Sequence, residues 1–248
     1  MKPHDTPKHW FDRRAIFHAD EGYPDPLEER LPALSDAMIA RRMERGVNVV
    51  AFDPGGTTGW SVFTLDVERL FDKTVRAHEV ITDWWHGEID CGAASGQLGS
   101  AASQYDLSAS EEGEAAGAHL CEKLVERHAR TLNCTVVVED FILRTQNQKR
   151  DALSPVRITA ILDYLLWEGK NVPYPIARQQ PSEAKTAITD ERLKLWDMWV
   201  PGGRHARDAD RHALLFVRKV REQRTKIFKA WPLLAEANNR DMLGLRST

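Results

Sequence analysis

The chain has 248 residues, of which 42% are hydrophobic and 29% are charged, so its composition is that of a globular protein rather than a disordered one. No apolar run approaches the ~20 residues that a membrane-spanning helix needs, and the polar N-terminus does not resemble a secretory signal. The three cysteines lie far apart, without the spacing of a zinc site or a disulfide framework. We therefore expect a cytoplasmic protein with no membrane contact.

Charge is unevenly distributed along the chain, although the formal net charge is only −3. Residues 1–140 carry 14 Lys and Arg against 25 Asp and Glu, whereas residues 141–248 carry 20 against 12. A basic half is typical of a chain with a polyanionic partner, but solvated helix faces produce the same asymmetry. Charge alone therefore leaves nucleic-acid binding open.

The chain begins with an N-terminal arm and a helix. Residues 1–26 hold four prolines and scattered charges, which predicts a poorly ordered arm. The pattern from Leu27 to Arg45 is helical, with Ser35 as the N-cap of its second half and Gly46 as its stop. We assign residues 1–46 to this arm and helix.

Asp53, at the end of a predicted buried strand, is the first candidate site residue. It lies in the stretch NVVAFDPGGTTGW, where an apolar run ends in a Pro-Gly-Gly turn. Such a strand delivers its last side chain to the edge of a sheet, where loops and ligands meet. An acid in this place is either an ordinary turn former or a group that binds metal or phosphate.

Strand and helix patterns continue to residue 222 and predict one mixed α/β domain over residues 47–222. A C-terminal tail follows at 223–248, with one short helix expected around Trp231 to Asn238. Closely spaced strand patterns near the start predict an antiparallel meander, which a Gly/Ser/Ala-rich excursion at 91–109 follows. The expected strands are 60–65, 77–81, 84–89, 134–138 and 172–177, and the expected helices are 110–131, 154–167, one opening at Pro181, 190–199 and 205–222.

A second buried run also ends in an acid, Glu139. If the two strands are parallel neighbours, the carboxylates of Asp53 and Glu139 lie at the same edge of the sheet. Two carboxylates so close together repel each other and raise each other's pKa unless a cation lies between them. A hard divalent ion with oxygen ligands meets that need, and Mg²⁺ fits best.

The last predicted helix supplies a third acid. His205, Asp208 and His212 are spaced i, i+3, i+7 and therefore share one helix face, next to an apolar stripe that starts at Ala209. Asp210 is expected to point toward the exposed side, with Arg207 and Arg211. Asp208 rather than Asp210 is therefore the predicted third acid.

Each of these residues also has a structural interpretation. Asp208 could cap the helix or pair with Arg204 or Arg211, and His205 could simply begin the helix. A histidine such as His212 is more often a packed, hydrogen-bonded core residue than a ligand. Asp140 is expected to point to the opposite face of the strand from Glu139, because side chains alternate along a strand.

The ordered set AFDPGGTTGW, VVVEDF, PSEAKTAIT and HARDADRHALL resembles the RuvC-like Holliday-junction resolvases of the RNase H-like superfamily, in particular divergent versions encoded by bacteriophages. The matching region spans roughly residues 47–222. The resemblance implies an RNase H-like fold, with a mixed central sheet, an antiparallel hairpin portion and helices on both faces. The Gly-Thr-Thr-Gly part of the first turn departs from the bacterial resolvases, and residues 1–45 and 223–248 have no counterpart.

The resemblance also implies roles for particular residues. Asp53, Glu139, His205 and Asp208 would hold two Mg²⁺ ions, for which Mn²⁺ would substitute, and cut branched DNA such as a four-way junction or a fork. Symmetric cutting of two strands would need a homodimer. The candidate phosphate contacts are Lys149, Arg150, Lys185, Arg207 and Arg211.

Two other functions remain open from the sequence. The DPGGTTG turn is similar to the first phosphate loop of the actin-like sugar kinases and ATPases, but the second phosphate loop and the adenosine motif of that class are not found. A junction-binding protein without catalysis is the other alternative, although the set of acids argues against it.

Overall fold

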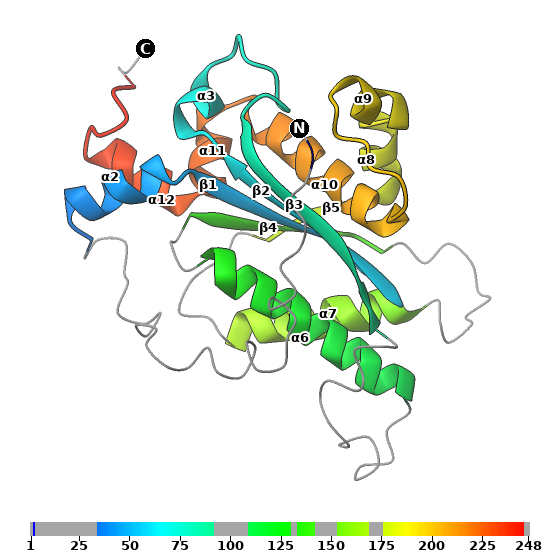
Figure 1. The fold of residues 1–248 in the computed structure, drawn as a ribbon. Coiled ribbons are helices and arrows are strands. Elements are labelled where there is room, and N and C mark those ends of the chain that lie inside the picture. Colours follow the sequence, from blue (N-terminus) through cyan, green and yellow to red (C-terminus); the bar gives the residue numbers. More distant parts are fainter. Residues whose placement is uncertain are drawn as a thin grey trace.

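A mixed sheet of five strands lies at the centre of the molecule (Figure 1). The computed structural model describes Lys2 and residues 34–91, 109–129, 133–141, 153–168 and 176–245. Several predicted features lie outside these residues: the arm at 1–26, residues 27–33 of the first helix, most of the excursion at 91–109, the start of the strand at 172–177, and the candidate phosphate contacts Lys149 and Arg150.

The sheet has the strand order β3-β2-β1-β4-β5. Strand β1 pairs antiparallel with β2, which pairs antiparallel with β3, while β1, β4 and β5 run parallel to one another. The predicted α/β class, with an antiparallel hairpin portion inside a mixed sheet, is therefore confirmed. The bounds of the strands are Val47–Asp53 (β1), Thr57–Leu65 (β2), Ile81–Asp90 (β3), Cys134–Glu139 (β4) and Ile176–Gln179 (β5).

Helices cover both faces of the sheet, as expected. Figure 1 shows α6 and α7 beneath the sheet and α10 on the opposite face, with α8, α9 and α11 beside it. None of the helices in the described ranges is long and apolar enough to cross a bilayer. The helices are Asp36–Glu44 (α2), Val67–Phe71 (α3), Ala109–Ala129 (α6), Ser154–Glu168 (α7), Pro181–Ala187 (α8), Asp190–Leu195 (α9), Arg204–Val220 (α10), Arg224–Ala230 (α11) and Pro232–Asn239 (α12).

Several predicted elements differ from the structure. The helix expected to reach Trp199 ends at Leu195, because the chain turns into a left-handed conformation at Asp197 (φ 54°). The strand expected at 77–81 is a turn as far as Val80, and β3 begins at Ile81. In the C-terminal tail, α12 confirms the short helix expected around Trp231 to Asn238, whereas α11 was not predicted. Between these two helices, the buried Trp231 donates a hydrogen bond to the carbonyl of Asn48 in β1 (2.9 Å).

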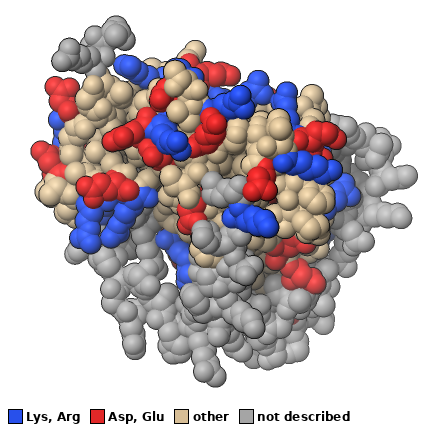
Figure 2. All heavy atoms as spheres, turned by 45° about the horizontal axis from the view of Figure 1, so that its top comes forward, with Lys and Arg blue, Asp and Glu red and all other residues tan. Residues whose placement is uncertain are grey.

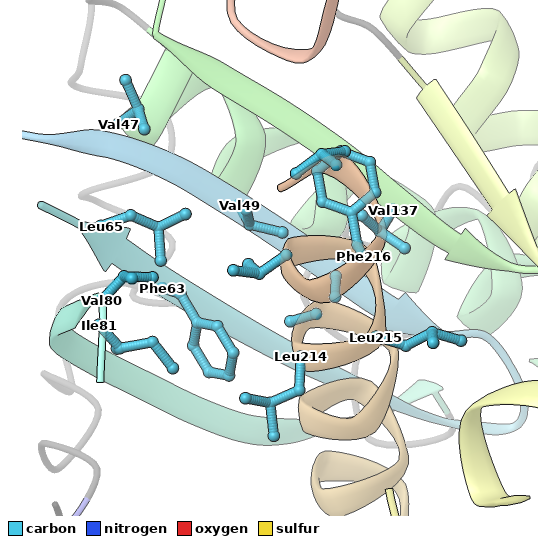
Figure 3. Close-up of a cluster of buried hydrophobic side chains, with 14 of the residues drawn as sticks. Val47, Val49, Phe63, Leu65, Val80, Ile81, Val137, Leu214, Leu215 and Phe216 are labelled. Atoms are coloured by element: carbon cyan, nitrogen blue, oxygen red, sulfur yellow. The ribbon is translucent and has the colours of Figure 1, made fainter. Parts of the chain in front are cut away.

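Alternation along β1 divides the core into two layers. Val47, Val49 and Ala51 face the layer that contains α10, whereas Val50 and Phe52 face α6 and α7. Figure 3 shows residues of the first layer, where Val49 and Phe63 of the sheet lie against α10. Side chains of a strand alternate between its faces, so Asp53, two residues beyond Ala51, belongs to the α10 face. The same rule places Glu139 there, because Val137 belongs to this layer.

His128, in the last turn of α6, provides a test of the fold in solution. Burial, followed by the positive charge of Arg127, lowers the pKa of its imidazole from 6.5 to about 4. The unfolded chain therefore binds more protons than the folded chain between these two values, and stability is lost as the pH falls from 6.5 to 4. As the pH falls from 6.5 to 4, the unfolding free energy of the original chain should drop by about 3 kcal/mol relative to that of His128→Leu, which lacks the imidazole. Urea unfolding of both proteins at pH 7, 5.5 and 4 measures this difference. His119→Leu, on the same helix, is the control; an equal difference there would contradict the prediction.

Candidate active site

The ends of two parallel strands bring Asp53 and Glu139 to the same edge of the sheet. Phe52 of β1 is in register with Val138 of β4, so the two acids stand side by side one residue further on. Asp53 is 7% exposed, whereas Glu139 is half-buried. The predicted convergence of the two strand ends is therefore observed.

The N-terminal end of α10 lies directly on β2 at Gly59. A methyl group added to Gly59 would collide with the backbone of His205 and lie 2.7 Å from the amide nitrogen of Ala206. Gly59 pairs with Asp53 on one side and with Glu88 of β3 on the other. Glu88 accepts hydrogen bonds from the backbone amides of His205 (2.8 Å) and Ala206 (3.4 Å) and so caps the helix.

His205 and Asp53 form the first contact of the site, with 2.8 Å between His205 Nδ1 and Asp53 Oδ2. Burial raises the pKa of the Asp53 carboxyl, and the charges of Glu139 and Asp208 raise it further, against the hydrogen bond from His205. The same hydrogen bond raises the pKa of His205. Glu139 and Asp208 therefore both lie within electrostatic reach of Asp53.

Asp208 projects from the first turns of α10 and is 3% exposed. One carboxylate oxygen accepts a hydrogen bond from Arg211, and the other lies 3.0 Å from Lys185 Nζ of α8. The structural alternative of pairing with Arg211 is therefore observed, and Lys185 forms a second ion pair. A buried carboxylate needs such partners, because an unpaired buried charge costs several kcal/mol.

Glu139 contacts His212, the third residue of the predicted α10 face. His212 Nε2 lies 2.7 Å from Glu139 Oε2, and His212 Nδ1 lies 3.0 Å from the Gln179 side chain of β5. With the Gln179 amide oriented to donate to Nδ1, the protonated Nε2 donates to Glu139. His212 is fully buried, as expected for a packed, hydrogen-bonded core histidine.

The donor chemistry of this edge fits a divalent cation. Three carboxylates and one imidazole meet on the same side of the sheet, and each acid already draws an imidazole or a cationic side chain to itself. In the conformation described, no group of three His, Cys, Asp or Glu side chains from the described ranges could hold one ion together. The three carboxylates are of the ligand type that suits Mg²⁺ and Mn²⁺, and each is held by a partner within the protein.

The prediction that Asp210 faces solvent is wrong. Asp210 is fully buried and accepts hydrogen bonds from Ser61 Oγ (2.7 Å) and Trp84 Nε1 (2.8 Å), while His86 Nδ1 lies 2.8 Å from it. The reason is that α10 crosses β2 and β3 and is covered on its other flank by α8, so it has almost no solvent face. The preference for Asp208 over Asp210 is unaffected, because Asp210 is satisfied by neighbours away from Asp53.

Arg211 is also buried, with 9% of its surface exposed, rather than on the outside of the helix. Its guanidinium donates to Asp208, to Asp190 and, through Nε, to the carbonyl of Ile188 (3.0 Å). Arg207 contacts the carbonyl of Val200 (2.9 Å) and lies over the ring of Trp199. Of the predicted phosphate contacts in the described ranges, Lys185 is the most exposed.

A charged hollow opens beside Asp208. It has a volume of about 420 Å³ and lies between α8, α9 and the start of α10. In the view of Figure 2, basic and acidic side chains are interspersed over the described part of the surface rather than gathered into one basic patch. The residues that line the hollow are Lys185, Thr189, Asp190, Glu191, Arg204, Arg207, Asp208 and Arg211.

Three residues of the site were missed in the sequence. Gly59 belongs to a turn motif, but its contact with a helix almost 150 residues later has no local signal. Glu88 stands in an ordinary strand pattern, and Gln179 is a single polar residue at a strand end. The position of Gln179 beside a conspicuous histidine is a property of the folded sheet, which only the pairing of β4 with β5 creates.

No family model matches the sequence, and no curated protein matches it. Among solved structures, the fold is similar to a Thermus thermophilus RuvC structure, with a TM-score of 0.45 and 16% identity over 71% of this chain and 96% of that chain. It is also similar to a T. thermophilus RuvC in complex with Holliday junction substrate, with a TM-score of 0.44 and 15% identity over the same shares.

Proposed function

We propose that this chain is a divalent-metal-dependent endonuclease that cuts branched DNA, with four-way junctions as the leading substrate. The observation that carries the proposal is the meeting of Asp53, Glu139 and Asp208 from β1, β4 and α10 on the same side of the sheet edge. The charges of Glu139 and Asp208 disfavour ionisation of Asp53, and a bound cation would offset this repulsion. The resemblance of the sequence motifs to RuvC-like resolvases supports phosphodiester hydrolysis as the reaction that such a cation would serve.

In the proposed reaction, Asp53, Glu139, Asp208 and His205 hold the cations at the scissile phosphate. Two Mg²⁺ or Mn²⁺ ions would, when bound, activate a water and stabilise the departing oxygen. Asp53 is the proposed central ligand, because the charges of Glu139 and Asp208 both raise the pKa of its carboxyl. His212 fixes the carboxylate of Glu139, and Glu88 fixes the end of α10 that carries His205.

Contacts to the DNA backbone are proposed for Lys185 and Arg207, which line the open hollow next to Asp208. Arg211 instead holds Asp208 in place. Phosphate contacts of this kind position DNA without reading its sequence. A homodimer is part of the proposal, because cutting two strands symmetrically needs two sites related by a two-fold axis.

Replacement of Lys185 gives a prediction for DNA binding. Lys185→Ala should weaken junction binding and lower the slope of log affinity against log salt by about 1, because one fewer counterion is released from the DNA. Fluorescence anisotropy of a labelled four-way junction at 50 to 200 mM salt measures the slope. Lys226→Ala removes a charge paired with Glu222 and serves as the matched control. An unchanged slope in Lys185→Ala would show that Lys185 does not contact the DNA backbone.

The experiment that tests the function is a cleavage assay on four-way, flap and linear duplex DNA, with Mg²⁺ and with EDTA. We expect cleavage of the branched substrates, only with Mg²⁺, leaving 5′-phosphate and 3′-hydroxyl ends. Junction binding without cleavage would favour the non-catalytic alternative. Tight ATP binding without any effect on DNA would favour the kinase-like alternative.

A further inference from the structure

Two positively charged side chains, Arg211 and Lys185, contact the carboxylate of Asp208, and they differ in how firmly each is held. Arg211 is buried and anchored by Asp190 and by the carbonyl of Ile188, in addition to Asp208. Lys185 is 44% exposed in its side chain, and within the described part of the chain Asp208 is its one ion-pair partner. Arg211 is therefore a fixed partner, whereas Lys185 can leave at little structural cost.

The oxygen that Lys185 occupies is the one that a cation would need. Oδ1 of Asp208 accepts a hydrogen bond from the fixed guanidinium of Arg211. Oδ2, 3.0 Å from Lys185 Nζ, is therefore the carboxylate oxygen whose partner can move away. An ammonium group and a divalent cation cannot share one carboxylate oxygen without strong repulsion between like charges. While Lys185 stays on Asp208, it lowers the affinity of the site for the cation.

The hollow beside Asp208 offers Lys185 an alternative partner. Its lining combines four basic side chains with three acids, and it opens to solvent. The basic residues are Lys185, Arg204, Arg207 and Arg211, and the acids are Asp190, Glu191 and Asp208. A phosphodiester in this hollow would attract the flexible, exposed ammonium of Lys185, which can reorient about its long stem. The guanidinium of Arg211 cannot respond in this way, because it is held at three points.

We propose that Lys185 exchanges between Asp208 and a DNA phosphodiester bound in this hollow, so that DNA binding frees Oδ2 of Asp208 for the divalent cation. The inference rests on the proposed function and adds a coupling between its two ligands. Coupling between two sites is reciprocal, so the cation must tighten DNA binding by the same factor by which DNA tightens cation binding.

The first test measures Mn²⁺ binding to the full chain without DNA, from the electron paramagnetic resonance signal of free Mn²⁺. Lys185→Met removes the competing charge, and we expect it to bind Mn²⁺ more tightly than the original chain by a factor on the order of ten. Lys185→Arg keeps the charge and should bind like the original chain, as should Lys226→Met. Circular dichroism checks that each variant is folded. Equal Mn²⁺ affinity in Lys185→Met and the original chain would overturn the exchange.

The second test measures the coupling itself, as the ratio of four-way junction affinities in Ca²⁺ and in EDTA. This ratio should be clearly smaller in Lys185→Met than in the original chain, and an equal ratio overturns the inference. The outcomes separate the inference from the proposed function. Cleavage by the original chain with no gain in Mn²⁺ affinity in Lys185→Met defeats the exchange alone, whereas the gain without any cleavage defeats the nuclease alone. Absence of Mn²⁺ binding in both proteins overturns both.

Discussion

Asp53→Asn is expected to abolish Mg²⁺-dependent cleavage while leaving the protein folded and able to bind junction DNA. The amide keeps the shape of the side chain and an oxygen that can accept a hydrogen bond from His205, but it removes the negative charge of the proposed central ligand. Loss of roughly 4 kcal/mol of transition-state stabilisation corresponds to a rate about a thousandfold lower. Single-turnover cleavage of a labelled four-way junction in Mg²⁺ measures the effect.

Junction binding should be unchanged or tighter in Asp53→Asn, because a negative charge facing the phosphate backbone has been removed. Asp140→Asn is the matched control: it removes an acid at the same end of the sheet, next in sequence to Glu139, and should retain cleavage. Retained Mg²⁺-dependent cleavage in Asp53→Asn would falsify the assignment of this residue as the central ligand.

Gly59→Ala is expected to destabilise the protein by about 3 kcal/mol and to impair cleavage in the fraction that remains folded. The added methyl group would collide with the backbone of His205, and a backbone segment held between strand and helix cannot move aside as a flexible side chain can. The helix must therefore shift off β2, which separates His205 from Asp53 and the two backbone amides from Glu88. Urea unfolding measures the loss of stability, and the cleavage assay measures the loss of activity that results from the displaced His205.

Gly56→Ala separates this contact from the general effect of replacing a glycine in the same glycine-rich stretch, because Gly56 lies in the turn just before β2. A methyl group at Gly56 meets no atom within 4 Å, so the stability should change by no more than about 0.5 kcal/mol and cleavage should persist. If Gly59→Ala proved as stable and as active as Gly56→Ala, the close approach of α10 to β2 would not be a requirement of the site.

Alternation and helical period were sufficient to locate most elements and the acids. Buried β-branched runs ending in an acid predicted both parallel strands, because hydrophobic burial and strand geometry are local properties. The N-cap at Ser35 and the helix opening at Pro181 were also readable, since capping chemistry lies within a few residues of the helix end. These signals reach only as far along the chain as the element itself.

Partners from distant elements could not be predicted in the same way. The polar stripe of α10 has the appearance of a solvent face, yet Ser61, Trp84 and His86 of the sheet surround Asp210, and Asp190 secures Arg211. The spacing of polar and apolar residues describes the helix alone and does not show which other elements of the fold will pack against its polar face. The same limit explains why Gly59, Glu88 and Gln179 were found only in the folded molecule.

The dependence of β1 on Trp231 has a consequence for synthesis of the protein. Asp208 lies in the last third of the chain, and the indole that binds the carbonyl of Asn48 and joins the core comes later still. A ribosome-bound chain that has exposed Asp53 and Glu139 thus lacks both the third acid and the segment that completes the core. Under the proposed function, a polypeptide that has not yet reached Asp208 and Trp231 would therefore be unable to cut DNA.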